Sequence, residues 1–335
     1  MSDTALAPWL QRQLHALLGW RAHAVLLSGP SGLGQYELGL ALARAWLCER
    51  PQPHGACGQC PSCHAIEVRT HADLCALLPE TLSLELGWPL DESTQRELDD
   101  KKRKPSKAIR VEAARQAVAF TQTTSARGGT QVVLVYPAER LNVEAANTLL
   151  KTLEEPSPSV RFVLATEAAH LLLPTIRSRC QTHTLQWPDE TEALPWLQVS
   201  GDMTPAAAQA WWRASGGRPD EALALSQRGF TPEQWAGLPQ ALARGDWKVL
   251  GEQAPAAQLD VLQKLCHDLM ARAAGAAPRF FPAEQLPPPP PWRVLARWAD
   301  ELAQAARSVE HPYQAGLLQE AWAARARQAL ATARR

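Results

Sequence analysis

The sequence predicts an α/β domain with a doubly wound parallel sheet, followed by a part built only of helices. Short apolar runs typical of buried strands alternate with helical patterns over the first half of the chain. A glycine-rich turn follows the first run, and after about residue 186 no strand pattern remains. The length of 335 residues fits roughly two or three domains.

The elements of the first part follow from apolar runs and from the residues that end them. Gly29 and Pro30 end the first run, and Pro156 ends the last helix because proline cannot continue one. The continuous run Val132–Tyr136 is typical of a central parallel strand. We expect strands over residues 24–29, 71–78, 132–136 and 161–166, and helices over residues 37–47, 111–122 and 143–155.

Three further features carry structural expectations. Residues 87–108 break the pattern, and their stretch 99–107 is dense in charge; we interpret it as a solvated mobile loop, with a nucleic-acid contact as the alternative. The run Pro287–Pro291 is interpreted as an extended surface loop, with a recognition ligand as the alternative. Several tryptophans are expected to anchor helices rather than to stack on bases: Trp211, Trp212, Trp235, Trp247, Trp292, Trp298 and Trp322.

Composition argues against two classes of partner. The 34 Lys and Arg residues balance the 34 Asp and Glu residues, so no net field draws the chain to nucleic acid or to an anionic membrane. No apolar run approaches the roughly 18–20 residues that a membrane span needs. The first residues show no secretory signal, so we expect a cytoplasmic protein without a membrane partner.

Four of the seven cysteines lie close together in sequence, at Cys48, Cys57, Cys60 and Cys63. Thiolates two residues apart can bind one tetrahedral ion where the backbone turns tightly, and Gly55, Gly58 and Pro61 supply the turns. Four sulfurs fill the coordination shell, so we expect structural zinc. Free thiols and an iron–sulfur cluster are the alternatives.

The turn after the first strand has the glycines of a phosphate-binding loop without its reactive side chains. Gly29, Gly32 and Gly34 fit the pattern G-x-x-x-x-G-K-[ST]. Gln35 stands where lysine reaches the β- and γ-phosphates, and Tyr36 stands where a hydroxyl binds Mg²⁺.

The acid that should hold Mg²⁺ after the strand 132–136 is also missing. Pro137 follows this strand, and Glu139 lies two residues beyond the expected position. These three losses predict the scaffold of a P-loop NTPase that does not hydrolyse ATP, and we expect no ATP as a cofactor.

Two motifs resemble those of bacterial clamp-loader subunits. The segment Ala146–Pro156 resembles their L-L-K-x-L-E-E-P signature, and Thr175–Cys180 resembles their S-R-C motif. The cysteine quartet also matches, and the resemblance covers about residues 15–185 well and the rest in outline. It implies a Rossmann-like AAA+ module over residues 1–186 with the zinc insertion at 48–63, a helical lid over 187–228, and a helical collar for oligomerisation over 229–335.

Within that family, the degenerate loop resembles the delta-prime branch of the bacterial DNA polymerase III clamp loader. The gamma/tau branch keeps the lysine, the threonine and the acid. The resemblance implies a non-hydrolysing stator in a hetero-pentameric ring with gamma/tau and delta subunits. Such a ring loads the sliding clamp on primer-template DNA at the replication fork, and it belongs to a DNA-directed DNA polymerase holoenzyme.

The S-R-C resemblance implies that Arg179 is an arginine finger offered in trans to the ATP of a neighbouring subunit. Ser178 and Cys180 are then supports of its loop, and a surface salt bridge is the alternative for Arg179. In the lid, Asp220 stands where active relatives carry an arginine, and Arg218 lies two residues earlier, so no nucleotide sensor is expected. The signature residues Lys151, Glu154 and Glu155 receive no catalytic role.

Two other functions remain open from the sequence. A gamma/tau-type ATPase is opposed by Gln35, Tyr36 and Pro137. A zinc-containing nucleic-acid-binding module would need a basic face, which the charge balance does not reveal.

Overall fold

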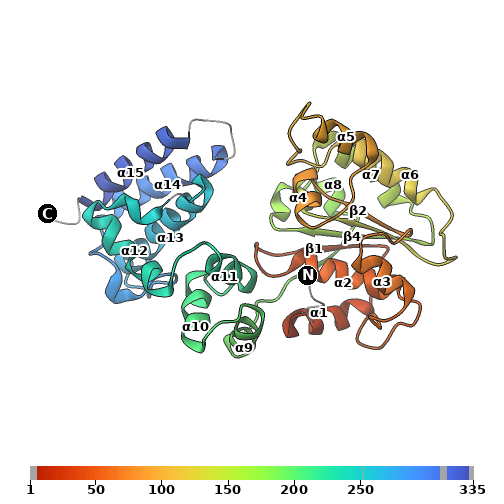
Figure 1. Ribbon diagram of the computed structural model, residues 1–335, viewed down its shortest axis with the longest axis horizontal. Helices are drawn as coiled ribbons and strands as arrows, with labels where there is room; N and C mark the ends of the chain where they lie inside the picture. Colours follow the sequence, from red (N-terminus) through yellow and green to blue (C-terminus); the bar gives the residue numbers. More distant parts are fainter. Residues whose placement is uncertain (1–5, 252, 310–314, 332–335) are drawn as a thin grey trace. The chain divides into compact units, whose positions relative to one another are not determined.

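The computed structural model describes residues 6–251, 253–309 and 315–331, and contacts divide the chain into two compact units, residues 1–188 and 189–335 (Figure 1). The first unit is α/β. The described part of the second unit contains helices and no strand. The predicted α/β class with a helical remainder is confirmed, whereas the division at residues 228 and 229 stays a prediction.

The first unit is built on a five-stranded parallel sheet with the order β2-β3-β4-β1-β5. Its strands are β1 (Ala24–Ser28), β2 (Leu74–Leu77), β3 (Gln131–Val135), β4 (Val160–Thr166) and β5 (Gln181–Thr184). Leu26 of β1 lies opposite Leu164 of β4, and Leu134 of β3 lies opposite Val163. Because all the strands are parallel, their carboxyl ends meet at one edge, where ligand loops of such sheets lie.

Helices cover both faces of this sheet (Figure 1). On one face α2 (Gln35–Leu47) packs so closely that a Cβ on Gly39 would lie 3.0 Å from Leu134 Cδ1, and α1 (Pro8–Leu18) packs on α2. On the other face lie α6 (Val111–Thr121), α7 (Val143–Glu154) and α8 (Pro174–Arg177), whose buried Ala114, Leu149 and Ile176 share a core with Phe162. The remaining α-helices of the unit are α3 (Pro61–Glu67), α4 (Glu80–Glu85) and α5 (Glu92–Asp99).

Strand β5 has no counterpart among the predicted strands. It reads Gln-Thr-His-Thr, contains no apolar side chain and is mostly exposed. Its place comes from backbone pairing with β1, in which Val25 lies opposite Gln181. An edge strand of this kind leaves no hydrophobic pattern for sequence reasoning to detect.

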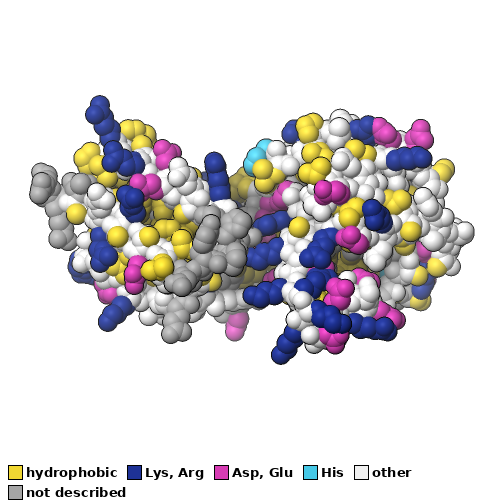
Figure 2. All heavy atoms as spheres, turned by 90° about the horizontal axis from the view of Figure 1, so that it is seen from above, with side chains coloured by type: hydrophobic (Ala, Val, Ile, Leu, Met, Phe, Trp, Pro, Cys, Tyr) yellow, Lys and Arg dark blue, Asp and Glu magenta, His cyan; other side chains and the backbone are white. Residues whose placement is uncertain are grey.

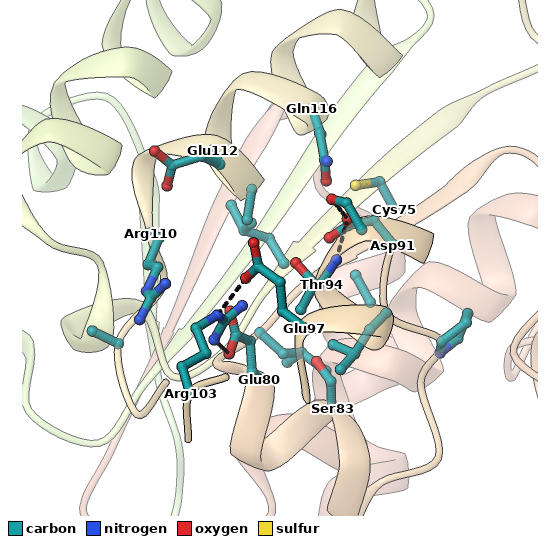
Figure 3. Close-up of a pocket in the computed structure, with 18 residues that line it drawn as sticks. Cys75, Glu80, Ser83, Asp91, Thr94, Glu97, Arg103, Arg110, Glu112 and Gln116 are labelled. Atoms are coloured by element: carbon teal, nitrogen blue, oxygen red, sulfur yellow. Dashed lines mark hydrogen bonds and ion pairs between the residues drawn. The ribbon is translucent and has the colours of Figure 1, made fainter. Parts of the chain in front are cut away.

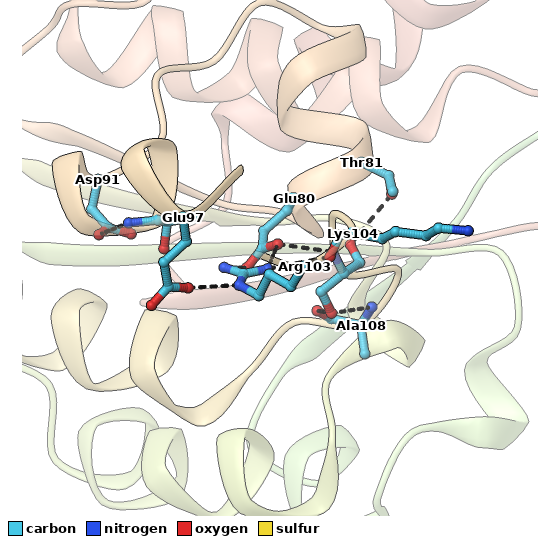
Figure 4. A network of polar contacts seen from close by, with 9 residues as sticks. Glu80, Thr81, Asp91, Glu97, Arg103, Lys104 and Ala108 are labelled. Atoms are coloured by element: carbon cyan, nitrogen blue, oxygen red, sulfur yellow. Dashed lines mark hydrogen bonds and ion pairs between the residues drawn. The ribbon is translucent and has the colours of Figure 1, made fainter. Parts of the chain in front are cut away.

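The charged stretch 99–107 lies outside helices and strands after its first residue, as expected for a loop, but α5 precedes it and an ion-pair network holds one of its cations (Figure 4). Arg103 donates from Nη1 and Nη2 to the two carboxylate oxygens of Glu80 on α4, at 2.5 and 2.9 Å. Its Nε donates to Glu97 of α5 at 2.7 Å. The Arg103 side chain is only 22% exposed, so one cation of this charge-dense stretch is largely covered.

The second unit is a stack of helices (Figure 1). They are α9 (Glu190–Ser200), α10 (Pro205–Ala214), α11 (Pro219–Ser226), α12 (Pro232–Arg244), α13 (Pro255–Ala273), α14 (Trp292–Ser308) and α15 (Ala315–Ala331). Short 3-10 helices of the two units lie at Ala138–Arg140, Ala169–Leu171, Trp247–Leu250 and Ala283–Gln285. Among the described residues, no helix combines the length and apolar character that crossing a bilayer would require.

Tryptophans form much of the core of the second unit. Trp235 stacks on Phe281 with ring centroids 5.3 Å apart and meets Trp211 edge-on. The expectation that tryptophans anchor helices is confirmed for Trp211, Trp212, Trp235, Trp298 and Trp322, which are all buried. It is wrong for Trp292, which is 53% exposed at the first position of α14.

The proline run lies outside any helix or strand, as expected for a loop. The side chain of Arg272 on α13 donates to the carbonyls of Leu286 and Pro287, at 3.0 and 3.3 Å. Asp268 is fully buried and accepts from the backbone N–H groups of Phe280 and Phe281, which precede the run. Charged side chains of α13 therefore fix the course of this connection.

We predict that Arg103→Ala speeds amide hydrogen exchange in α5 and proteolysis between residues 87 and 108. α5 has no buried residue of its own, and the pair between its Glu97 and Arg103 ties it to the neighbouring segment. Removal of the guanidinium leaves Glu80, whose side chain is 15% exposed, without its ion pair and with the Ser106 N–H as a donor, at a cost of about 1–3 kcal/mol. Lys104→Ala, which removes a neighbouring exposed cation, is the control. Equal exchange rates in the two variants would contradict the network's role.

Candidate functional site

The loop between β1 and α2 keeps the backbone of a phosphate-binding turn. Gly32 and Gly34 have φ of 81° and 89°, a conformation that side chains with a Cβ adopt rarely. A Cβ on Gly34 would also lie 2.5 Å from Leu10 Cδ1 of α1. The glycine positions predicted for this loop therefore have a physical reason that does not depend on a ligand.

Gln35 closes the loop on itself. Its side chain is buried, and Nε2 donates to the carbonyls of Gly29 and Pro30, at 2.8 and 2.7 Å. A primary amide has two hydrogens to donate, and both are used here. Gln35, which stands where the phosphate-binding lysine would be, therefore uses both of its side-chain donors on the backbone of its own loop.

Tyr36 is equally committed to the protein interior. Its hydroxyl accepts a hydrogen bond from Trp88 Nε1 at 2.7 Å, and its ring lies 5.4 Å from the ring of Tyr136. Burial raises the pKa of Tyr36 above its ordinary value. A neutral, buried phenol in this position serves packing and offers no ligand for Mg²⁺.

The displaced acid Glu139 is bound to the end of β4. Thr166 Oγ1 donates to one of its carboxylate oxygens at 2.7 Å, and the backbone N–H of Glu167 donates to the other at 3.1 Å. Tyr136 donates its hydroxyl to Glu167 at 2.8 Å. Burial, and after it the negative charge of Glu167, raises the pKa of Glu37. Carboxylates thus gather where a triphosphate would need cations.

The four cysteines of the insertion lie together in one cluster. Their Sγ atoms are all within 4.8 Å of one another, and Sγ of Cys48 lies 3.8 Å from Cys60 and 3.7 Å from Cys63. The backbone N–H of Gln59 is the main cause that lowers the pKa of Cys57 to about 6, whereas burial raises the pKa of Cys63 to about 12. The quartet predicted from spacing could hold one metal ion.

The S-R-C segment forms the turn between α8 and β5. Ser178 is exposed and donates to the carbonyl of Thr175 at 3.2 Å. Cys180 packs against the sheet core, and burial raises its pKa to about 12. Between them, Arg179 pairs through Nη2 with Glu154 of α7 and donates from Nη1 to the carbonyl of Thr175 at 2.7 Å.

The predicted residues thus fall into three places in the first unit. The degenerate loop and Glu139 lie at the carboxyl edge of the sheet, the cysteines lie beyond α2, and the S-R-C turn lies beside the end of α7. Sequence reasoning missed Trp88, for which no signal exists, and the partner role of Glu154, which stands in the recognised signature. In the second unit, Arg218 donates from Nε to the carbonyl of Ser215 at 2.9 Å.

A cavity of about 380 Å³ lies under α5, lined from β2, α4, α5 and α6 (Figure 3). Several of its charged groups are engaged: Arg103 pairs with Glu80 and Glu97, and Asp91 accepts from the backbone N–H of Thr94 at 2.9 Å, while Arg110 and Glu112 also line the cavity. These contacts leave no evident recognition chemistry, so we assign no ligand to it.

Charge is mixed on the surface in view. Figure 2 shows Asp and Glu side chains among the Lys and Arg side chains over the unit of residues 1–188. A face of this composition gives no support to a nucleic-acid-binding module, which would need a basic patch.

The chain is similar to subunits of a bacterial DNA polymerase. Residues 6–189 match a family described as "DNA polymerase III, delta subunit". DNA polymerase III subunit delta' of Escherichia coli is 37% identical over 287 residues, which cover 81% of this chain and 78% of that protein. The delta' subunit of Pseudomonas aeruginosa is 36% identical over 256 residues, covering 75% and 69%. Subunit tau of Escherichia coli is 31% identical over 252 residues, covering 73% of this chain and 33% of tau.

We predict that Gly34→Ala lowers the stability of the first unit by about 2–4 kcal/mol, because backbone strain adds to the collision with Leu10. Gly128→Ala is the matched control, since Gly128 has φ of 69° and no heavy atom within 4 Å of a Cβ. Gly128→Ala therefore carries the backbone strain without a collision. Urea unfolding of both variants measures the difference in the free energy of unfolding. Equal losses of stability would show that the Leu10 side chain moves aside at no cost.

Proposed function

The chain belongs to the family of DNA polymerase III delta' subunits, and from that membership we propose that it is a clamp-loader subunit that spends no ATP itself. It joins gamma/tau and delta subunits in a pentameric ring that loads the sliding clamp on primer-template DNA. Its own contribution is a fixed AAA+ module and a single arginine presented to a neighbouring ATPase. The lid and collar of the second unit complete the ring contacts.

The observation that carries the non-hydrolysing role is the pair of hydrogen bonds made by Gln35. A P-loop lysine cradles the β- and γ-phosphates with a positive charge, and a hydroxyl and an acid hold the magnesium ion. Here the amide is used by the loop, the phenol of Tyr36 by Trp88, and the carboxylate of Glu139 by Thr166. Each of these three side chains is already bound to the protein, which supports a stator over a gamma/tau-type ATPase.

The observation that supports an arginine finger is the build of the S-R-C turn. Cys180 anchors one side of the turn in the core, and exposed Ser178 leaves the other side at the surface. Arg179 between them keeps its charge at any ordinary pH and offers a planar fork of donors to phosphate. A finger supplied in trans is worth about 10³–10⁵ in rate in related phosphoryl-transfer systems.

We further propose that the cysteine quartet holds a structural zinc ion. A tetrahedral site with Zn–S bonds of about 2.3 Å places its sulfurs about 3.8 Å apart, and the separations from Cys48 are 3.8 and 3.7 Å. Four thiolates leave no position for water, so the ion would fix the insertion between α2 and α3 rather than take part in a reaction.

Arg179→Ala is expected to leave the ring assembled while clamp loading falls by about tenfold or more, because one ATP site loses its charge stabilisation. The measurement is clamp loading on primed DNA by a ring reconstituted with gamma/tau and delta subunits. Arg177→Ala, which removes an exposed arginine from the same turn, is the control. Full loading by an assembled Arg179→Ala ring would refute the finger, and ATP turnover by the purified chain alone would refute the stator.

The purified full chain is expected to carry about one zinc ion. Cys63→Ser should abolish retention and lower the midpoint of thermal unfolding, whereas Cys75→Ala, outside the quartet, should retain the metal. Because protons compete with the ion for thiolates, retention should weaken as the pH falls. Elemental analysis checks the content, and iron with acid-labile sulfide, or no metal at all, would exclude zinc.

A further inference from the structure

The guanidinium of Arg179 lies folded back against residues of its own subunit, and this is its stowed position. Nη2 pairs with Glu154, and Nη1 donates to the carbonyl of Thr175 at 2.7 Å and to Ser178 Oγ at 3.4 Å. Nε is buried without a hydrogen-bond partner. Both terminal nitrogens are therefore engaged. The side chain is only 26% exposed, so little of the group faces solvent.

The site that receives Arg179 is negative for two reasons. Glu154 is the last residue of α7, so its carboxylate stands at the carboxyl end of a 12-residue helix. The carbonyls at such an end carry a partial negative charge that attracts cations. α8 packs against α7 and carries Thr175, which brings the S-R-C turn to that end.

We propose that Glu154 is a positioning residue that holds Arg179 against its own subunit and competes for it with the triphosphate of the neighbouring subunit. This inference rests on the proposed function of Arg179. The guanidinium has five N–H donors, and three of them serve Glu154, Thr175 and Ser178, so it must leave these partners before both Nη groups can form a fork with a phosphate of a neighbouring subunit. Stowed and extended positions of the arginine are therefore exclusive.

This Glu154–Arg179 ion pair, the latch, is weak enough to break during a working cycle. Glu154 is 49% exposed, and ion pairs exposed to this degree shift a population by about twofold to fivefold. A phosphate group carries more negative charge and can accept both Nη groups as a fork. Arg179 should therefore leave Glu154 for the neighbouring site only when a triphosphate is bound there.

The first test is ATP hydrolysis by reconstituted rings in the absence of clamp and DNA. Glu154→Gln, which removes the charge and keeps the size, should raise this basal rate about twofold to fivefold and lower the KM for ATP. Glu155→Gln is the matched control, because Glu155 is the adjacent exposed carboxylate and has no ion pair with Arg179. An unchanged or lower rate in Glu154→Gln would overturn the latch.

The second test needs no ring and no ATP. The full chain is treated with phenylglyoxal, and modification at Arg179 is followed by mass spectrometry. Glu154→Gln should react about twofold to fivefold faster at Arg179 than the parent chain, while Glu155→Gln reacts at the parent rate. Thermal unfolding confirms that each variant is folded, and equal reactivity of Glu154→Gln and the parent would overturn stowage.

The two proposals fail in different ways. If Arg179→Ala loads clamps normally, the finger is refuted whatever Glu154 does. If Arg179→Ala loses loading while Glu154→Gln leaves both basal rate and reactivity unchanged, the finger stands and the latch falls. The double variant should hydrolyse ATP at the rate of Arg179→Ala, because a latch has no effect without the group it holds.

Discussion

The parallel register of the central strands is the constraint on which the rest of the first unit depends. Because β1, β3 and β4 run the same way, the glycine loop after β1, the turn after β3 and Thr166 at the end of β4 meet at one edge. This edge would serve a nucleotide in an active relative. Here the same proximity lets Gln35, Tyr36 and Glu139 find partners within the protein, so the edge is closed by hydrogen bonds instead of by phosphate.

The chemistry that remains lies at a different place on the same scaffold. Arg179 lies in the turn that leads from α8 into β5, and it draws on α7 for its counter-charge. The sheet orients this turn, because Cys180 packs against the core and β5 pairs with β1 immediately afterwards. The position of Arg179 therefore depends on α7, α8 and β5 and not on the glycine loop after β1.

How much could be foreseen depended on whether a signal was local. The Val132–Tyr136 run and the spacing of the cysteine quartet are local, and both the strand and the sulfur cluster lie where they were expected. β5 left no signal because its stability comes from pairing with β1. Two ion pairs, Arg103 with Glu80 and Arg179 with Glu154, join residues far apart in the chain. Only tertiary structure brings such charges together.

The contact between Tyr36 and Trp88 bears on what it would take to place lysine and threonine in this loop. Trp88 is 8% exposed, donates its only N–H to the Tyr36 hydroxyl, and carries the guanidinium of Arg69 over its ring at 4.9 Å. Restoring lysine and threonine at positions 35 and 36 would strand a buried indole N–H and deprive two loop carbonyls of their donor. This pair of substitutions would thus demand compensating changes at positions far apart in the sequence, which ties the side chains of the loop to Trp88 and to the loop's own backbone.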